Sequence, residues 1–88
     1  MRSHLTTMFY FDVREGGQLV SDEEGQQLSS LDAAVQEAAE AAAAIARDVL
    51  PSRRGGEVVV EVRNEDRNHV LTVSVEMYVT TIRTGSER

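Results

Sequence analysis

Residues 33–46 read AAVQEAAEAAAAIA, and nine of these fourteen residues are alanine. A helix with so little side-chain bulk can bury its apolar face only by lying very close to a flat partner. Segments in which apolar residues alternate with polar ones precede and follow the stretch, as is typical of β-strands. The sequence therefore predicts one alanine-rich helix packed on a β-sheet.

The boundaries of this helix follow from the residues on either side of it. Ser29 or Ser30 can accept a hydrogen bond from an exposed N–H of the first turn, and Asp32 suits the positive end of the helix dipole. Pro51 is expected to stop the helix near Leu50. The apolar stripe is expected to consist of residues 31, 34, 35, 38, 42, 45 and 49.

Two strands are predicted before the helix. In the first, residues 8–14, Phe9, Phe11 and Val13 point to one face and Met8, Tyr10, Asp12 and Arg14 to the other. Paired glycines at 16 and 17 favour a tight hairpin turn, so residues 18–21 would form a short returning strand. We expect Leu19 or Val20 of this second strand to lie in the core.

Two further strands are predicted after the helix. The third has Val58, Val60 and Val62 on one face and Val59, Glu61 and Arg63 on the other. The polar residues 64–68 turn the chain into a fourth strand, from about His69 to Val79. In the fourth strand Leu71, Val73 and Val75 oppose Val70, Thr72, Ser74 and Glu76.

The predicted order is strand, strand, helix, strand, strand, which indicates an α+β fold. One helix would cover one face of a mainly antiparallel four-stranded sheet in a two-layer sandwich. We expect a single domain over residues 8–79, a disordered lead-in over residues 1–7 and a frayed tail over residues 80–88. The uncovered face is expected to carry apolar residues, and its candidate interface consists of Met8, Tyr10, Val59 and Tyr78.

The composition excludes several classes of function. The chain has 15 acidic and 9 basic residues, so it would repel a polyanion, and we expect no direct binding of nucleic acid. All nine basic residues are arginine and cysteine is absent, which excludes lysine Schiff bases, thiolate metal sites and cysteine nucleophiles. No leader peptide or membrane-spanning segment is recognised, so we expect a soluble, cytoplasmic protein with no membrane partner.

The candidates for catalysis or metal binding are few. Asp22, Glu23 and Glu24 could offer oxygen ligands to a divalent cation, but their spacing lacks the alternation of a calcium loop, and a solvated turn is favoured. His4 and His69 have no neighbour in sequence that would complete a metal pair. The serines are better explained as helix caps and turn residues. We therefore expect no enzymatic activity, no cofactor and no metal.

The stretch from Phe9 to Ala39 resembles a family of small bacterial proteins catalogued as a domain of unknown function. Its members have an aromatic strand, a glycine turn, an Asp-x-x-Gly motif, an alanine-rich helix and a final hairpin. In this sequence the second hairpin departs from that pattern, because Asp66-Arg67-Asn68 replaces a glycine-containing turn. The matching residues are Phe9, Tyr10, Phe11, Gly16, Gly17, Asp22, Gly25, Leu28, Leu31, Ala33, Ala34 and Ala38, followed by Val70-Leu71-Thr72-Val73.

A weaker, architectural similarity links the chain to small antitoxins of the HicB type, which neutralise a partner toxin. The acidic, proline-containing linker of that family is missing here. Two hypotheses on function follow. The first is a structural or interaction module that forms a homodimer, or binds another protein, through its open sheet face or an edge strand. The second is a small-molecule- or metal-responsive binding domain that uses the acidic turn and the two tyrosines.

Overall fold

The computed structural model describes residues 5–83, which form one helix and one sheet. The strands are β1 (Thr7–Glu15), β2 (Gln18–Val20), β3 (Gln26–Leu28), β4 (Gly56–Asn64) and β5 (His69–Met77), and the helix is α1 (Leu31–Arg53). Residues 1–4 and 84–88, which belong to the predicted lead-in and tail, lie outside the described residues. β1 begins one residue before the predicted strand, and β5 ends two residues before the predicted limit at Val79.

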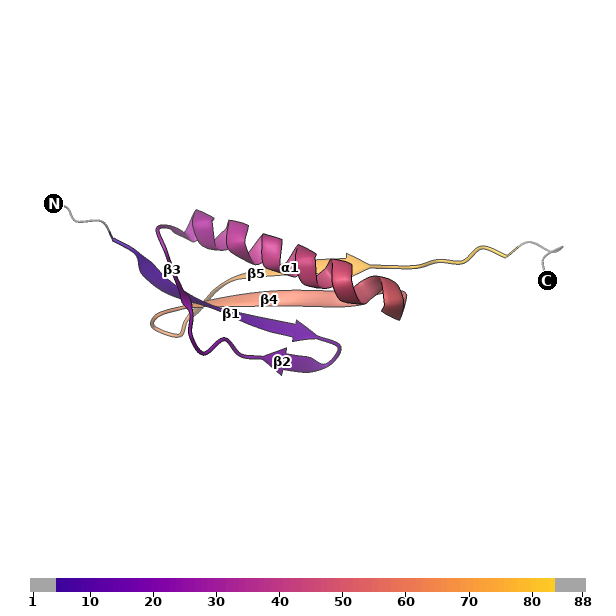
Figure 1. Ribbon diagram of the computed structural model, residues 1–88, viewed down its shortest axis with the longest axis horizontal. Coiled ribbons are helices and arrows are strands. Elements are labelled where there is room, and N and C mark those ends of the chain that lie inside the picture. Colours follow the sequence, from indigo (N-terminus) through magenta and orange to yellow (C-terminus); the bar gives the residue numbers. More distant parts are fainter. Residues whose placement is uncertain (1–4, 84–88) are drawn as a thin grey trace.

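The sheet is antiparallel throughout and has the strand order β2-β1-β4-β5, with β3 also paired to β1. Helix α1 lies over β4 and β5 on one face of the sheet (Figure 1). The predicted α+β, two-layer architecture is therefore confirmed, with five strands in place of four. The missed strand, β3, is three residues long and mostly polar, so its sequence has no apolar alternation to reveal it.

The ends of α1 are closed by hydrogen bonds. Ser30 is the N-cap, and its Oγ accepts from the N–H of Ala33 at 3.0 Å, as predicted. The helix does not stop at Leu50, because Pro51 is accommodated in the exposed last turn. Because proline has no N–H, one hydrogen bond of the last turn is lost, the one to the carbonyl four residues earlier. Arg54 then takes a left-handed conformation, and the N–H of Gly55 donates to the Leu50 carbonyl at 3.1 Å.

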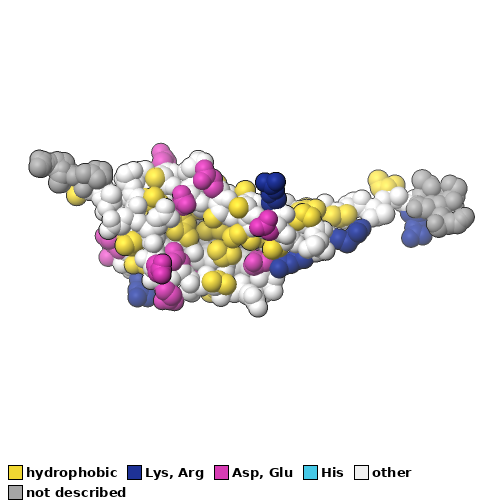
Figure 2. Space-filling model, in the orientation of Figure 1, with side chains coloured by type: hydrophobic (Ala, Val, Ile, Leu, Met, Phe, Trp, Pro, Cys, Tyr) yellow, Lys and Arg dark blue, Asp and Glu magenta, His cyan; other side chains and the backbone are white. Residues whose placement is uncertain are grey.

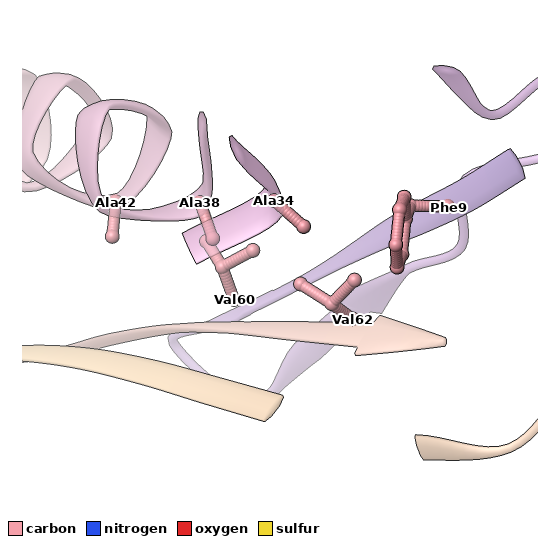
Figure 3. Close-up of a cluster of buried hydrophobic side chains, with 6 residues drawn as sticks. All are labelled: Phe9, Ala34, Ala38, Ala42, Val60 and Val62. Carbon is pink, nitrogen blue, oxygen red and sulfur yellow. The ribbon is translucent and has the colours of Figure 1, made fainter. Parts of the chain in front are cut away.

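The core lies between the middle of the sheet and the buried face of α1 (Figure 3). This face is called the alanine stripe, because four of its five buried residues are alanine. Ala34, Ala38 and Ala42 have no exposed surface and pack with Val60 and Val62. The buried stripe continues through Ala46 to Leu50, and the predicted Ile45 and Val49 are partly buried against these residues. The predicted Leu31 and Val35 are instead 50% and 42% exposed. The buried residues are four positions apart, and in a helix of 3.6 residues per turn each one is rotated by about 40° around the helix axis from the one before. The stripe therefore winds around the helix and follows the twist of the sheet.

The prediction that Leu19 or Val20 enters the core is wrong. Leu19 is 51% exposed and Val20 is 60% exposed. The reason is the placement of α1 over β4 and β5, which leaves the β2 side of the sheet without a helix above it (Figure 1).

The second hairpin turns without glycine because Arg67 takes its place. Arg67 has a φ of 70°, in the left-handed region that a glycine usually occupies. The Asn64 side-chain oxygen accepts from the N–H groups of Asp66 and Asn68, at 2.9 and 3.0 Å, and so holds the turn.

Candidate functional site

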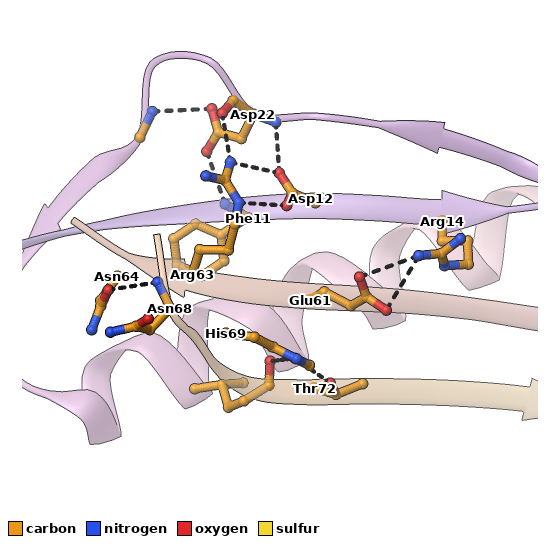
Figure 4. Close-up of polar contacts among 12 residues, drawn as sticks. Phe11, Asp12, Arg14, Asp22, Glu61, Arg63, Asn64, Asn68, His69 and Thr72 are labelled. Carbon is orange, nitrogen blue, oxygen red and sulfur yellow. Dashed lines mark hydrogen bonds and ion pairs between the residues drawn. The ribbon is translucent and has the colours of Figure 1, made fainter. Parts of the chain in front are cut away.

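The face of the sheet opposite α1 is polar rather than apolar. Arg14 pairs with Glu61 at 3.3 Å, and Arg63 pairs with Asp12 at 2.8 Å (Figure 4). The predicted interface residues Met8, Tyr10 and Val59 lie on this face but are partly buried. These ion pairs interrupt the apolar surface, so the face does not offer the continuous patch that the alternation suggested.

The fourth predicted interface residue, Tyr78, lies beyond the end of β5. It is 83% exposed, and its hydroxyl donates to Glu76 at 3.0 Å. That hydrogen bond raises the pKa of the Tyr78 phenol. Tyr10 lies opposite Arg63, whereas Met77 lies opposite Gly56, seven residues away along β4. At about 3.3 Å per residue the two tyrosines are roughly 23 Å apart, so they cannot line one ligand site.

Asp22 is the organising residue of the turn between β2 and β3. Its Oδ2 accepts from the N–H of Phe11 on β1 at 3.0 Å, and its Oδ1 accepts from Glu24 and Gly25, both at 3.0 Å (Figure 4). Phe11 lies between the segment of β1 that pairs with β2 and the segment that pairs with β3. The Asp22 carboxylate therefore satisfies a backbone N–H of β1 that neither short strand reaches. This role explains the Asp-x-x-Gly motif.

Gly25, the last residue of the Asp-x-x-Gly motif, stands where the turn has no room for a side chain. Its φ is +75°, and a Cβ added there would lie 2.8 Å from Cε2 of Tyr10 and 2.9 Å from Sδ of Met8. The turn therefore packs against two of the predicted interface residues and accounts for part of their burial.

Asp12 on β1 and Arg63 on β4 join Asp22 in one group of polar contacts, the Asp22 cluster. Asp12 is buried, at 8% exposure, and accepts from Nε and Nη2 of Arg63 at 2.8 and 3.1 Å. It also accepts from the N–H of Asp22 at 2.9 Å, while Arg63 donates to the Asp22 carbonyl at 3.3 Å. The Arg63 guanidinium lies 5.0 Å from the centre of the Tyr10 ring, within the range of a cation–π contact.

These contacts keep both carboxylates ionised. The hydrogen bond from Arg63 lowers the pKa of Asp12, and the bond to Asp12 raises the pKa of Arg63. Burial raises the pKa of Asp22, but the hydrogen bonds from Phe11, Gly25 and Glu24 outweigh it and the net pKa is lowered. A general acid or base needs a pKa near the working pH, so neither carboxylate suits that role.

A polar hollow of about 280 Å³ lies beside the cluster. Its lining carries both signs of charge, and it brings the predicted Asp22 and Glu23 next to Tyr10. The lining residues are Tyr10, Ser21, Asp22, Glu23, Arg63, Glu65 and Arg67.

Of the other predicted ligands, Glu24 is exposed and is not among the residues that line this hollow. The imidazole of His69 lies within hydrogen-bond distance of Thr72 Oγ1, at 2.7 Å, and of the Leu71 carbonyl, at 3.0 Å. His4 lies outside the described residues. Within residues 5–83, no three His, Cys, Asp or Glu side chains are grouped so that they could hold a metal ion.

The two edges of the sheet differ strongly. One edge consists of the three-residue strands β2 and β3, separated by the Asp22 turn. The other is β5, which has nine residues and pairs with no strand on its outer side in the described part of the chain. Broken edges resist further pairing, whereas a long regular edge is open to it.

Beyond β5 the chain runs away from the body of the molecule and carries apolar side chains (Figures 1 and 2). Tyr78 is 83%, Val79 46% and Ile82 81% exposed. The sequence indicates that an edge strand could pair but does not identify β5, because strand order depends on contacts distant in sequence. No helix in the described range has the length and hydropathy needed to cross a membrane.

The comparisons with known proteins identify a family. Neither the curated proteins nor the solved structures contain a match to the chain. The model of one family, described as a domain of unknown function (DUF6894), matches residues 8–76. The match confirms the first resemblance and gives no support to the HicB one. Because it spans most of the sequence, from the start of β1 almost to the end of β5, the chain belongs to the DUF6894 family.

Proposed function

We propose that the protein is a non-catalytic interaction module that pairs with a second copy of itself through β5. The observation that carries this proposal is the nine-residue outer edge of β5, which has no strand partner among the described residues. Its central residues 71–75, LTVSV, are uncharged and include no glycine or proline. Such an edge is a template for strand addition, and pairing two copies would satisfy its backbone groups.

The edge is favoured over the open sheet face. On that face the side chains of Asp12, Arg14, Glu61 and Arg63 are already joined in ion pairs. Covering the Arg14–Glu61 pair, which is partly exposed, with a partner would remove it from water without offering new countercharges. The β5 edge carries no such cost over its central residues.

A non-catalytic role is supported by the state of the Asp12 and Asp22 carboxylates. The carboxylates of Asp12 and Asp22 each accept several hydrogen bonds and have lowered pKa values. Groups held in this way stabilise a turn, and their lowered pKa values make them poor general acids or bases near neutral pH. We assign the Asp22 cluster to the stability of the fold.

We further propose that the partner is protein and that the module acts in the cytoplasm. The chain has a net charge of −6, which disfavours contact with phosphate-rich nucleic acid or anionic lipid surfaces. Strand pairing, in contrast, uses backbone groups and depends little on net charge.

The test is the mass in solution of the protein and of two variants with the same added charge. The unmodified chain is expected to have twice its 9.7 kDa mass at tens of micromolar. Ser74→Glu places a carboxylate on the β5 edge, and the dissociation constant should rise at least about tenfold, because like charges oppose one another across paired strands. Gln27→Glu adds the same charge to β3, on the other edge, and should remain dimeric.

Analytical ultracentrifugation measures these masses, and circular dichroism checks that each variant is folded. A monomeric unmodified chain would overturn the proposal. Equal weakening by Ser74→Glu and Gln27→Glu would also overturn it, because the effect would then come from net charge and not from the edge.

A further inference from the structure

We infer that the two β5 strands pair antiparallel about a two-fold axis at Val75, so that each copy's Tyr78 and Val79 lie on the β5 strand of the other. This inference rests on the proposed self-association and specifies its geometry. It assigns a role to residues 78–79, which pair with no strand in the described part of the chain because β4 begins at Gly56, opposite Met77.

The first argument is the alternation of side chains along β5 and beyond it. Val73, Val75 and Met77 are partly buried on the helix side, whereas Thr72, Ser74 and Glu76 are exposed on the open side. An extended continuation places Val79 on the helix side and Tyr78 on the open side. Val79 is accordingly the less exposed of the two, at 46% against 83%.

The second argument is the match of side chains that this register produces. Val75 faces Val75 of the second copy, Met77 faces Val73, and Val79 faces Leu71, all on the helix side. On the open side Tyr78 faces Thr72 and Glu76 faces Ser74. Apolar residues thus meet apolar residues, and aromatic residues pair well with β-branched ones across strands.

The third argument is the charge of Glu76. Within the chain Glu76 already lies opposite Glu57 on β4. An axis at Glu76 would bring the two Glu76 carboxylates face to face, and like charges directly opposite are destabilising. An axis at Val73 avoids this contact but leaves Tyr78 and Val79 uncovered. The axis at Val75 both separates the two carboxylates and covers the two apolar residues. An axis at Ser74 would also do so, but it would place Val79 opposite the polar, exposed His69 instead of Leu71.

Residues 78–79 should therefore contribute to the affinity. Replacing Tyr78 and Val79 together with serine is expected to raise the dissociation constant at least about tenfold, because two apolar contacts per copy are lost. Thr80→Ser with Thr81→Ser, in the adjacent positions, should change it less than about threefold. Sedimentation at a series of concentrations measures both constants. An unchanged constant for the Tyr78 and Val79 variant would overturn their assignment.

The register is tested by oxidative cross-linking, which is clean because the chain has no cysteine. Ser74→Cys and Glu76→Cys are made separately, and both sites are exposed and outside the core. With the axis at Val75, residue 74 of one copy lies opposite residue 76 of the other, about 5 Å apart between Cα atoms. Residues 74 and 74, or 76 and 76, lie on a diagonal at about 7–8 Å, beyond the usual reach of a disulfide.

A mixture of the two variants, allowed to exchange subunits, should therefore form a disulfide dimer at least tenfold faster than either variant alone. Fast cross-linking of Ser74→Cys alone would place the axis at Ser74, and fast cross-linking of Glu76→Cys alone would place it at Glu76. Either result overturns the inference, as does a dimeric mass with no cross-link in any sample. A monomeric mass for the unmodified chain overturns the proposed function itself.

Discussion

Replacing Ala38 with leucine is expected to lower the free energy of unfolding by about 3 kcal/mol, since overpacking a closed core forces the backbone apart. Ala38 has no exposed surface and packs with Val60 and Val62 beneath the helix (Figure 3). An isobutyl group in place of a methyl group has no space there, so α1 must move away from β4 along its length. For a chain of this size the melting temperature should fall by roughly 15 °C, measured at constant protein concentration.

The matched control is Ala43→Leu, in the same helix and with the same change of side chain. Ala43 is exposed, so the additional bulk enters solvent and the melting temperature should change by less than about 3 °C. Chemical denaturation followed by circular dichroism gives both free energies. Similar values for the two variants would show that the alanine stripe does not set the distance between helix and sheet.

The buried faces of the strands can be predicted from sequence more exactly than the buried face of the helix. Alternation at Phe9, Phe11 and Val13, and at Val58, Val60 and Val62, identifies the strands and their buried faces because a strand has a period of two. The exact buried face of α1 is less readable, because alanine occurs on every side of the helix. Only packing against the twisted sheet selects Ala46 and Leu50 over Leu31 and Val35.

The Asp22 cluster could be predicted only in part. The turn at Asp22 and Gly25 is visible from residue type, and so is the placement of Asp12 and Arg63 on the open faces of their strands. Their contact is not visible, because Asp12 and Arg63 are 51 residues apart and meet only through the pairing of β1 with β4. The short strand β3 is likewise defined by its position after the Asp22 turn and not by its own residues.

Replacing Asp22 with alanine is expected to cost about 3 kcal/mol of unfolding free energy, because the N–H groups of Phe11, Glu24 and Gly25 lose a charged acceptor. Asp22→Asn keeps one acceptor oxygen, which can still bond the turn, and loses the second; we expect about half the cost. Glu23→Gln removes the same charge from the exposed neighbouring residue and should cost less than about 0.5 kcal/mol. A Glu23→Gln effect as large as that of Asp22→Asn would mean that charge, and not these bonds, sets the stability.

The dependence of stability on pH follows from the same bonds. In the folded chain the pKa values of Asp12 and Asp22 lie below 3.8, the ordinary value of an aspartate side chain. A lowered folded pKa stabilises the native state above the unfolded pKa, and that contribution is lost as the pH falls through the folded pKa. The unfolding free energy of the unmodified chain should therefore decrease below about pH 4, whereas that of Asp22→Asn should decrease less steeply. Urea denaturation at a series of pH values measures both slopes, and identical slopes would show that the Asp22 carboxylate is not coupled to folding.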